Sequence, residues 1–259
     1  MKAAAIERRM EIFNVVTSQG KARVEELAAR FNVSSVTIRS DLTFLEENGY
    51  IVRSHGAAIP NTGVIAELSV HEKRHRNSGV KSQIGLAAAK LIHSGDAVIL
   101  DSGTTTREIA GHLRGLENVV VMTNGLDVAV ELVSSPGIEV VCTGGVLRKS
   151  AMSFSGSQAE ACLKNFCFDK VFLGVDGFDL RAGITTHNEQ EASLNRLMCE
   201  ISDQVIAVAD STKFGKRGYH MIRDFTDIDI LVTDSGVPDE YVERLREAHV
   251  EVIIAEKEK

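Results

Sequence analysis

The sequence lacks any apolar run close to the roughly 20 residues that a helix needs to cross a bilayer. It also lacks a secretion signal, because Glu7, Arg8, Arg9 and Glu11 interrupt the apolar stretch that such a signal requires. These absences disfavour a membrane protein with spanning helices and an exported protein. We therefore expect a cytoplasmic protein without a membrane partner.

Cysteine is scarce, with four residues in the chain: Cys142, Cys162, Cys167 and Cys199. No two of them form a CxxC pair, and no histidine stands at a zinc-finger spacing from them. The simplest interpretation is that they are buried free thiols in a reducing compartment. We accordingly expect no metal site, and nothing in the sequence calls for a cofactor.

An excess of basic residues is missing as well, since the net charge is −7 at pH 7. Such a charge disfavours nucleic-acid binding, but it is unevenly distributed. Residues 1–60 hold eight Lys and Arg against seven Asp and Glu, residues 61–80 carry +1, and residues 81–259 carry −9. The mildly basic N-terminal part would hold DNA weakly in one copy, because affinity grows with the number of phosphates neutralised. A homo-oligomer, either a dimer or a tetramer, would supply more than one DNA-reading head.

The first 58 residues have the pattern of a winged helix-turn-helix. Apolar residues recur at helical spacing in three segments, 4–18, 24–31 and 35–48. Residues 50–59 then read as two short strands that form a hairpin. Three helices followed by a two-stranded wing predict a DNA-binding domain over residues 1–58, with the third helix in the major groove.

The third segment has one apolar face and one polar face. At about 100° per residue, Ile38, Leu42 and Leu45 fall on one side and should pack inward. The opposite side carries hydroxyls, an arginine and a valine, which suit phosphate oxygens, base edges and thymine methyl groups. With two wing residues added, the predicted DNA-contacting set is Ser34, Ser35, Val36, Thr37, Arg39, Ser40, Thr43, Arg53 and His55. Periodicity alone equally allows a plain three-helix unit with a solvated face.

The residues themselves favour DNA binding. Val-Ser-Ser-Val-Thr-Ile-Arg-Ser-Asp-Leu-Thr-Phe-Leu-Glu-Glu-Asn-Gly at 33–49, followed by Arg-Ser-His-Gly-Ala at 53–57, closely resembles the signature of the DeoR family of transcriptional regulators. The resemblance implies a double-stranded DNA operator as the partner. Two positions depart from the family: Ser40, where it often has a second arginine, and Ala57, where it often has a second glycine.

Beyond residue 80 helices alternate with short β-branched strands. This alternation predicts an α/β domain over residues 81–259 with a mostly parallel sheet. Strands are expected at 97–100, 119–122, 138–142, 170–175, 205–209, 228–232 and 250–254, and helices at 82–92, 106–114, 126–134, 189–202 and 241–248. The polar and basic segment 59–80 is predicted to be a linker with some helix.

Four loops at predicted strand ends are rich in glycine and hydroxyl side chains: 101–106, 123–125, 143–145 and 174–177. Backbone N–H groups at such turns, together with a helix N-terminus, attract anions. The strand ends of an open parallel sheet converge on one crevice, where ligands bind. No Walker motif is present, because the first loop lacks the GK[ST] sequence. The loops therefore predict a phosphate site of another kind.

The order of these loops also resembles the sensor domain of DeoR regulators, over nearly all of residues 81–259. Further matches are Ser-Phe-Ser-Gly at 153–156, Gly-Ile-Thr-Thr at 183–186, Glu191 and Asp-Ser-Thr-Lys at 210–213. The resemblance implies a fold like that of ribose-5-phosphate isomerase and a phosphorylated sugar as the effector that releases the repressor. The stretch 186–200 looks most like repressors of N-acetylgalactosamine utilisation, which implies an amino-sugar phosphate or a close catabolic relative.

Roles for individual residues follow from their chemistry. We expect the phosphate to lie on the 102–106 loop, Asp176 to accept protons from sugar hydroxyls, and Lys213 to pair with phosphate or with Glu191. The full predicted effector-binding set is Asp101, Ser102, Gly103, Thr104, Thr105, Thr106, Thr123, Asn124, Gly144, Gly145, Asp176, Gly177, Glu191 and Lys213.

Two other functions compete with a regulated repressor. A sugar-phosphate isomerase could use Asp176 and Glu191 as acid and base. The isomerase pattern, however, has an extra carboxylate where this chain has Leu173-Gly174, and a lysine where it has Arg181, which stays protonated. We therefore expect binding without turnover, and not an enzyme. A constitutive DNA-binding scaffold would show no ligand-induced shift in melting temperature.

Overall fold

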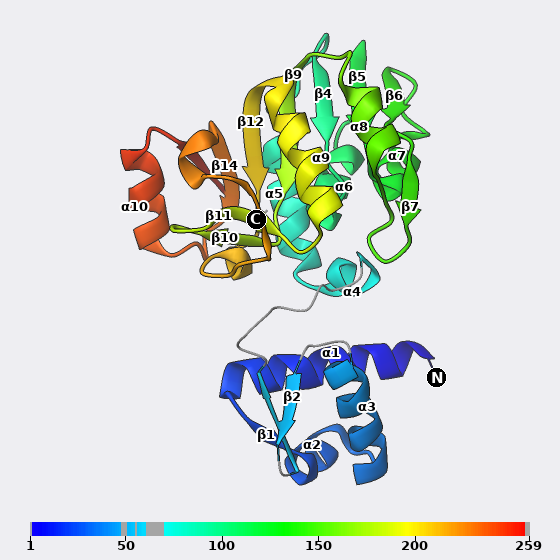
Figure 1. The fold of residues 1–259 in the computed structure, drawn as a ribbon, viewed down its shortest axis with the longest axis vertical. Helices are drawn as coiled ribbons and strands as arrows, with labels where there is room; N and C mark the ends of the chain where they lie inside the picture. The colour runs from blue at the N-terminus through cyan, green and yellow to red at the C-terminus, as the bar shows by residue number, and fades with distance from the viewer. Residues whose placement is uncertain (1, 48–50, 55, 61–69, 257–259) are drawn as a thin grey trace. The chain divides into compact units, whose positions relative to one another are not determined.

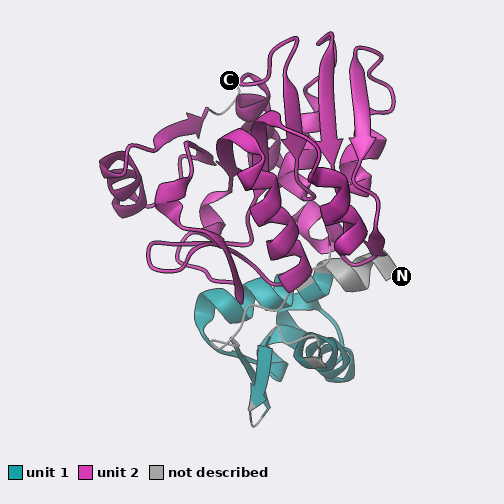
Figure 2. Ribbon diagram, turned by 45° about the horizontal axis from the view of Figure 1, so that its top comes forward, with its two compact units in different colours: residues 1–68 teal, residues 69–259 magenta. Residues whose placement is uncertain are grey.

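The computed structural model describes residues 2–47, 51–54, 56–60 and 70–256, and the chain divides into two units, Met1–Leu68 and Ser69–Lys259 (Figure 2). Among the described residues no helix is long and apolar enough to cross a membrane. Within the same ranges, no cluster of three or more His, Cys, Asp or Glu side chains is arranged to hold a metal ion.

The first unit is a three-helix domain with a small antiparallel sheet. Its elements are α1 (Lys2–Gln19), β1 (Ala22–Arg23), α2 (Val24–Phe31), α3 (Ser35–Glu47), β2 (Ile51–Ser54) and β3 (Ala57–Pro60) (Figure 1). β3 pairs with both β1 and β2. Ile38, Leu42 and Leu45 of α3 are buried with Ile12 and Val16 of α1. The predicted winged helix-turn-helix is confirmed.

Two polar arrangements fix the orientation of α3. The backbone N–H of Thr37 donates to Ser34 Oγ at 3.1 Å, which caps the start of the helix. Asp41 lies on the inward face and is only 2% exposed. Its two carboxylate oxygens accept from Nε of Arg8 and Nε of Arg9 of α1, both at 2.7 Å. Charge therefore joins α3 to α1 in addition to apolar packing.

The second unit is an α/β domain built on a seven-stranded parallel sheet. The sheet strands are β4 (Ala97–Leu100), β5 (Val119–Thr123), β6 (Ile138–Cys142), β9 (Phe168–Gly174), β12 (Ser202–Val208), β14 (Ile230–Asp234) and β15 (Glu251–Ala255). They lie in the order β15-β14-β12-β9-β4-β5-β6, and each pairing is parallel. The predicted mostly parallel α/β fold is confirmed.

Helices cover both faces of this sheet (Figure 1). One face packs against α5 (Ser78–Ala89), α6 (Thr104–Gly111) and α7 (Leu126–Leu132), and the other against α8 (Ser157–Leu163), α9 (Glu189–Glu200) and α10 (Asp239–Glu247). Successive residues of one strand pack on opposite faces of the sheet: Val98 and Leu100 of β4 lie in one core, and Ile99 lies in the other.

Smaller elements lie outside this sheet, and the sequence did not predict them. β7 (Val146–Arg148) and β8 (Ser153–Ser155) form a hairpin, while β10 (Gly177–Asp179), β11 (Gly183–Thr186) and β13 (His220–Arg223) form a three-stranded sheet. The segment 59–80 was expected to be a linker with some helix. α4 (Val70–His75) and the start of α5 are helices within it, and both belong to the second unit. Val70 of α4 and Lys81 of α5 are buried, so these two helices pack within the second unit.

The cysteines correct one expectation. All four are free, but only Cys199 is buried; Cys162 is half-buried, and Cys142 and Cys167 are exposed. Cys142 ends the edge strand β6, and Cys167 lies in the loop before β9, so neither reaches a core.

Candidate functional sites

The outer face of α3 is open to solvent, as the periodicity predicted. Val36 is 71% exposed, Arg39 and Ser40 are exposed, and Thr37 and Thr43 are half-buried. One solvent-facing side of the helix therefore presents hydroxyl groups, a guanidinium and an apolar side chain together.

The wing is joined to this face through Arg53 of β2. Its Nη1 donates to Thr43 Oγ1 at 2.9 Å, and its backbone N–H donates to Glu46 Oε1 at 3.0 Å. Two residues predicted separately, one in the helix and one in the wing, thus form a single polar surface. Ser34 is exposed and Ser35 half-buried at the start of α3, whereas His55 lies outside the described residues.

A pocket in the second unit lies where the sheet order reverses. β4 is followed along the chain by β5 and β6 on one side, whereas β9, β12, β14 and β15 lie on the other. Ligands bind at such switch points in open α/β sheets, outside the carboxyl ends of the strands. The pocket opens to solvent. It is lined by Lys73, Lys81, Ser102, Gly103, Thr104, Thr105, Gly174, Val175, Asp176, Thr186, Glu191 and Lys213.

The loop between β4 and α6 forms one wall. The backbone N–H of Ser102 is fixed by Asn124 Oδ1 at 2.8 Å and by Asp101 Oδ1 at 2.6 Å. Gly103 precedes the first turn of α6, which begins at Thr104. The N–H groups of a first turn have no carbonyl partner within the helix, so they and the helix dipole suit an anion.

Positive charge converges opposite this wall. Burial lowers the pKa of Lys81 to about 8, and burial also lowers the pKa of Lys213. Burial would raise the pKa of Asp176, but the ammonium groups of Lys73 and Lys213 outweigh that effect and hold it below its usual range. Lys73 Nζ lies 2.5 Å and Lys213 Nζ 3.9 Å from Asp176 Oδ1. The carboxylate of Asp176 therefore lines the same pocket as Lys73, Lys81 and Lys213.

Glu191 completes the polar wall. Its Oε2 lies 2.6 Å from Arg148 Nη2 and 3.3 Å from the hydroxyl of Thr186. The same hydroxyl is 3.2 Å from Asp176 Oδ2. Lys213 was predicted to pair with phosphate or with Glu191; in the structure its ammonium lies 3.9 Å from Asp176 Oδ1, and Glu191 pairs with Arg148. The pocket wall therefore offers carboxylate oxygens that can accept from hydroxyl groups, next to cationic side chains that can bind an anion.

The structure divides the predicted effector residues into two groups. Seven of them line the pocket: Ser102, Gly103, Thr104, Thr105, Asp176, Glu191 and Lys213. The others lie outside its lining: Asp101, Thr106, Thr123, Asn124, Gly144, Gly145 and Gly177. Of these, Asp101 and Asn124 support Ser102, and Thr106 donates to the carbonyl of Gly103 at 3.1 Å. Their contribution is to hold the loop in shape.

The sequence did not predict Lys73, Lys81 and Thr186 as pocket residues; Gly174 and Val175 lie in the 174–177 loop, which was predicted at the site, but they were not named individually. Lys73 belongs to a basic cluster whose composition is that of a linker, and Thr186 ends a motif whose pattern assigns it no role. Asp101 was grouped with the ligand contacts, but it is only 1% exposed. Burial, and then the negative charge of Glu191, raise the pKa of Asp101 well above its ordinary value.

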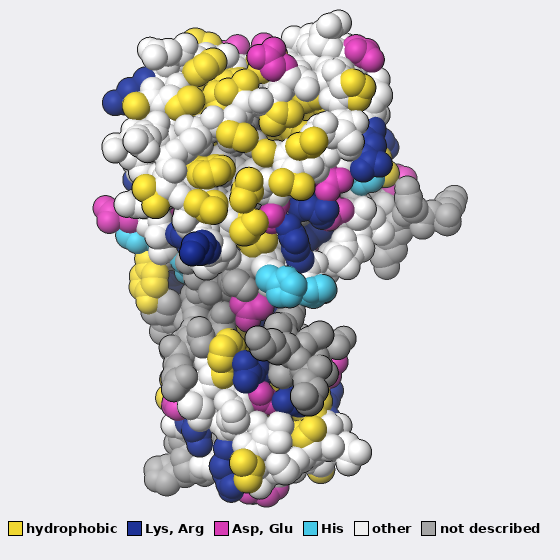
Figure 3. Space-filling view, turned by 90° about the vertical axis from the view of Figure 1, so that its right-hand side faces the viewer, with side chains coloured by type: hydrophobic (Ala, Val, Ile, Leu, Met, Phe, Trp, Pro, Cys, Tyr) yellow, Lys and Arg dark blue, Asp and Glu magenta, His cyan; other side chains and the backbone are white. Residues whose placement is uncertain are grey.

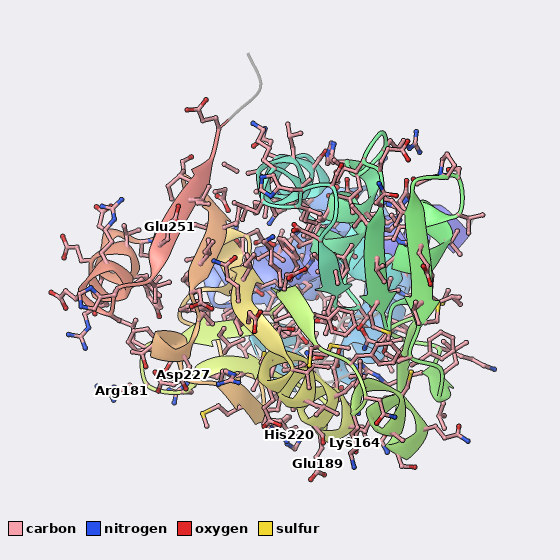
Figure 4. The ribbon with its side chains drawn as sticks, turned by 90° about the horizontal axis from the view of Figure 1, so that it is seen from above. Lys164, Arg181, Glu189, His220, Asp227 and Glu251 are labelled. Carbon is pink, nitrogen blue, oxygen red and sulfur yellow. The ribbon has the colours of Figure 1, made fainter. Side chains whose placement is uncertain are left out.

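Arg181, which stands where an isomerase would have a lysine, does not line the pocket. It is exposed at the periphery of the unit, in the turn between β10 and β11 (Figure 4). The structure therefore brings no proton-transferring group from this position to Asp176.

Comparisons with known proteins match both units. Residues 8–63 match the model of a DeoR-like helix-turn-helix domain, and residues 76–235 match the model of a DeoR C terminal sensor domain. An Escherichia coli O157:H7 protein described as an aga operon transcriptional repressor is 47% identical, over 96% of this chain and 93% of its own length. The repressor GlcR of Bacillus subtilis is 33% identical, with 97% of each chain covered. Ribose 5-phosphate isomerase A of Methanocaldococcus jannaschii is similar in structure, at a TM-score of 0.40 and 14% identity over 53% of this chain and 55% of that chain.

Proposed function

Because this chain belongs to the DeoR family of transcriptional regulators, we propose that it represses an operon for amino-sugar catabolism and leaves its operator when it binds a phosphorylated sugar. The family is one of DNA-binding regulators with a sensor domain, and not of enzymes. The observation that carries the proposal is the pocket of the second unit, where a helix N-terminus and lysine ammonium groups surround a space bordered by carboxylates. This is the chemistry of a ligand that combines a phosphate with hydroxyl groups.

For DNA, we propose that α3 enters the major groove. Arg39 would contact a guanine edge or a phosphate, Ser40 and Thr43 would bond to base or phosphate oxygens, and Val36 would contact a thymine methyl. The exposure of Val36, Arg39 and Ser40 supports this assignment, and Thr43 is half-buried beside them. Arg53 would lie along the backbone next to them, since it already bonds to Thr43.

For the effector, we propose that the phosphate lies on the first turn of α6, at Ser102 to Thr105, with Lys213 as a counter-charge. Asp176 and Glu191 would accept from sugar hydroxyls. The amino-sugar class rests on the similarity to the E. coli protein, whose description names the aga operon. We place this regulator in the cytoplasm, where DNA and sugar phosphates both occur.

The DNA-binding unit is only mildly basic, so we propose that two or more copies act together. β6 is an edge strand of the sheet, and hydrophobic side chains gather on the side of the second unit that carries it (Figure 3). Val133 is 82%, Val146 69% and Val130 64% exposed. A second copy of this chain would cover this edge.

Analytical sedimentation tests the oligomer. The wild-type chain should sediment as a dimer or larger species, and Val133→Glu should shift the distribution toward monomer. A wild-type monomer at micromolar concentration would refute the oligomer.

The experiment that tests the function has two steps. Full-length protein first selects duplexes from a random pool, which yields a DNA site without assuming any operator sequence. Fluorescence anisotropy then measures affinity for that site with and without phosphate esters of galactosamine and N-acetylgalactosamine. We expect at least a tenfold weakening with an effective ester and none with the unphosphorylated sugar, as is typical of allosteric coupling of about 5- to 150-fold. Unchanged affinity with every sugar phosphate would overturn the induction mechanism.

A further inference from the structure

α4 is a short helix that owes its position to contacts with the rest of the second unit. It has six residues, too few to be stable in isolation. Val70 is its buried residue, and the backbone N–H of Val70 donates to the carbonyl of Ser150 at 2.8 Å. Two ion pairs also attach it: Arg74 pairs with Asp127 at 2.5 Å, and Lys73 pairs with Asp176 at 2.5 Å. A helix held in part by ion pairs can respond when one of those pairs changes partner.

Two of its attachments lead directly into the pocket. Lys73 and its partner Asp176 both line the pocket. Lys81, a third lining residue from α5, donates its ammonium to the carbonyls of Lys73 at 2.5 Å and Arg76 at 2.8 Å. That ammonium lies at the C-terminal end of α4, where carbonyl groups lack helical partners and positive charge is favourable. The position of α4 is therefore determined by the same charged groups that a ligand would meet.

The position of α4 along the chain relates the pocket to the segment that joins the two units. It is the first described element after residues 61–69, the segment that joins the two units covalently. Lys73 and Asp176 are 103 residues apart in sequence, so their ion pair ties the end of the connecting segment to the end of strand β9. A change at the pocket thus reaches the connection to the DNA-binding unit within one short helix.

We propose that Lys73 contacts the effector and makes α4 its sensor: an anionic ligand in the pocket becomes the partner of Lys73 in place of Asp176, and α4 shifts with it. This inference rests on the proposed function, because it requires a phosphorylated ligand. Asp176, released from Lys73, is then available to accept from a sugar hydroxyl. The shift of α4 is expected to change the affinity for DNA.

Lys73→Met tests the inference, because it removes the ammonium and keeps much of the aliphatic stem. The readout is the ratio of DNA affinities without and with the most effective galactosamine phosphate ester, measured on the selected duplex. For the wild-type chain we expect a ratio of about ten or more, and for Lys73→Met a ratio within about twofold of one. Calorimetric titration should show that Lys73→Met still binds the ester, because the α6 turn and Lys213 remain. Lys73→Arg, which retains the charge, should retain a measurable response.

Arg74→Met is the matched control. It removes an ion pair of equal length from the same helix, but its partner Asp127 does not line the pocket. We expect Arg74→Met to keep the wild-type ratio. Hydrogen exchange of peptides covering residues 70–76 should change on addition of the ester in the wild-type and Arg74→Met chains and stay constant in Lys73→Met.

The outcomes separate this inference from the proposed function. If no sugar phosphate changes the DNA affinity of the wild-type chain, the proposed function fails and this inference with it. If the wild-type chain responds and Lys73→Met, still folded by its thermal melt, responds equally, only the role of Lys73 is overturned. Loss of response in both Lys73→Met and Arg74→Met also overturns it, because any loosening of α4 would then suffice.

Discussion

Replacing Asp41 by asparagine should destabilise the DNA-binding unit more than any single change on the exposed face of α3. The carboxylate is 2% exposed and accepts from Nε of Arg8 and Nε of Arg9, both at 2.7 Å. Asparagine has nearly the same shape but no charge, and only one of its two terminal atoms accepts hydrogen bonds. The substitution therefore leaves two guanidinium groups without their counter-charge and forces one of them to find another acceptor.

The magnitude follows from how buried the three side chains are. Removing one partner of a fully buried ion pair costs about 3–5 kcal/mol. Here the arginine side chains keep 20% and 25% of their exposure, so water partly replaces the lost carboxylate. Hydrogen bonds to charged groups contribute about 1.5–3 kcal/mol each, and asparagine can keep one in weaker form. We expect a loss of about 2–3 kcal/mol in the free energy of unfolding of this unit.

Hydrogen exchange in the full-length protein measures this loss where it occurs. Peptides from α1 and α3 should exchange about 30- to 140-fold faster in Asp41→Asn, since each 1.4 kcal/mol corresponds to about a factor of ten. Peptides from the second unit should not change. Asp203→Asn, the same substitution at an exposed site in β12, is the control and should stay within about 0.5 kcal/mol of wild type. A loss below about 1 kcal/mol in Asp41→Asn would show that these arginine contacts do not hold α3.

Three further predictions concern single residues. Arg39→Ala should weaken binding to the selected duplex by about 1–3 kcal/mol in a gel-shift assay, whereas Lys90→Ala, an exposed change in the second unit, should not; equal effects would refute the role of Arg39. The folded state raises the pKa of Asp101, so the contribution of Asp101 to stability is full below pH of about 4 and declines as pH rises. Asp101→Asn, which can still accept from Ser102, should therefore raise the melting temperature at pH 7. A lower melting temperature would contradict this. Gly177→Ala would place a Cβ 2.5 Å from the carbonyl oxygen of Lys216, so it should cost about 1–3 kcal/mol in a denaturant titration, while Gly79→Ala, with open space around it, should be nearly neutral.

The sequence predicted those parts of the structure that depend on local patterns. The spacing of Ile38, Leu42 and Leu45 determined which side of α3 faces the core, and the structure buries all three. The main parallel strands were recognised because short runs such as Val98–Leu100 are apolar on both faces. The loops after β4 and β9 were expected to meet at one edge of the sheet, and both line the pocket.

What the sequence did not predict depends on contacts between distant residues. Nothing near Lys73 indicates that its partner is Asp176, and nothing near Asp41 indicates that Arg8 and Arg9 lie beside it. β11 and β13 pair across more than thirty intervening residues, with a shift of register between Ile184 and Thr185, so no local signal marks them as one sheet. Charged side chains in such places look like ordinary surface residues until the fold brings their partners to them.

The pocket's charges make a last prediction about pH. Burial lowers the pKa of Lys81 to about 8, against the opposing attraction of Asp210, and the nearby ammonium groups of Lys213 and Lys73 and the guanidinium of Arg76 lower it further. A phosphate ester is already a dianion above pH of about 7. Raising the pH to about 9 removes positive charge from Lys81, and from Lys213 to the extent that burial lowers its pKa, and should weaken binding of the ester about tenfold or more, by calorimetric titration. Unfolding would not explain such a loss, because a lysine whose pKa falls on folding contributes stability that rises with pH between about 8 and its unfolded value. Equal affinity at pH 7 and pH 9 would show that the charge of Lys81 does not contribute to binding the ligand.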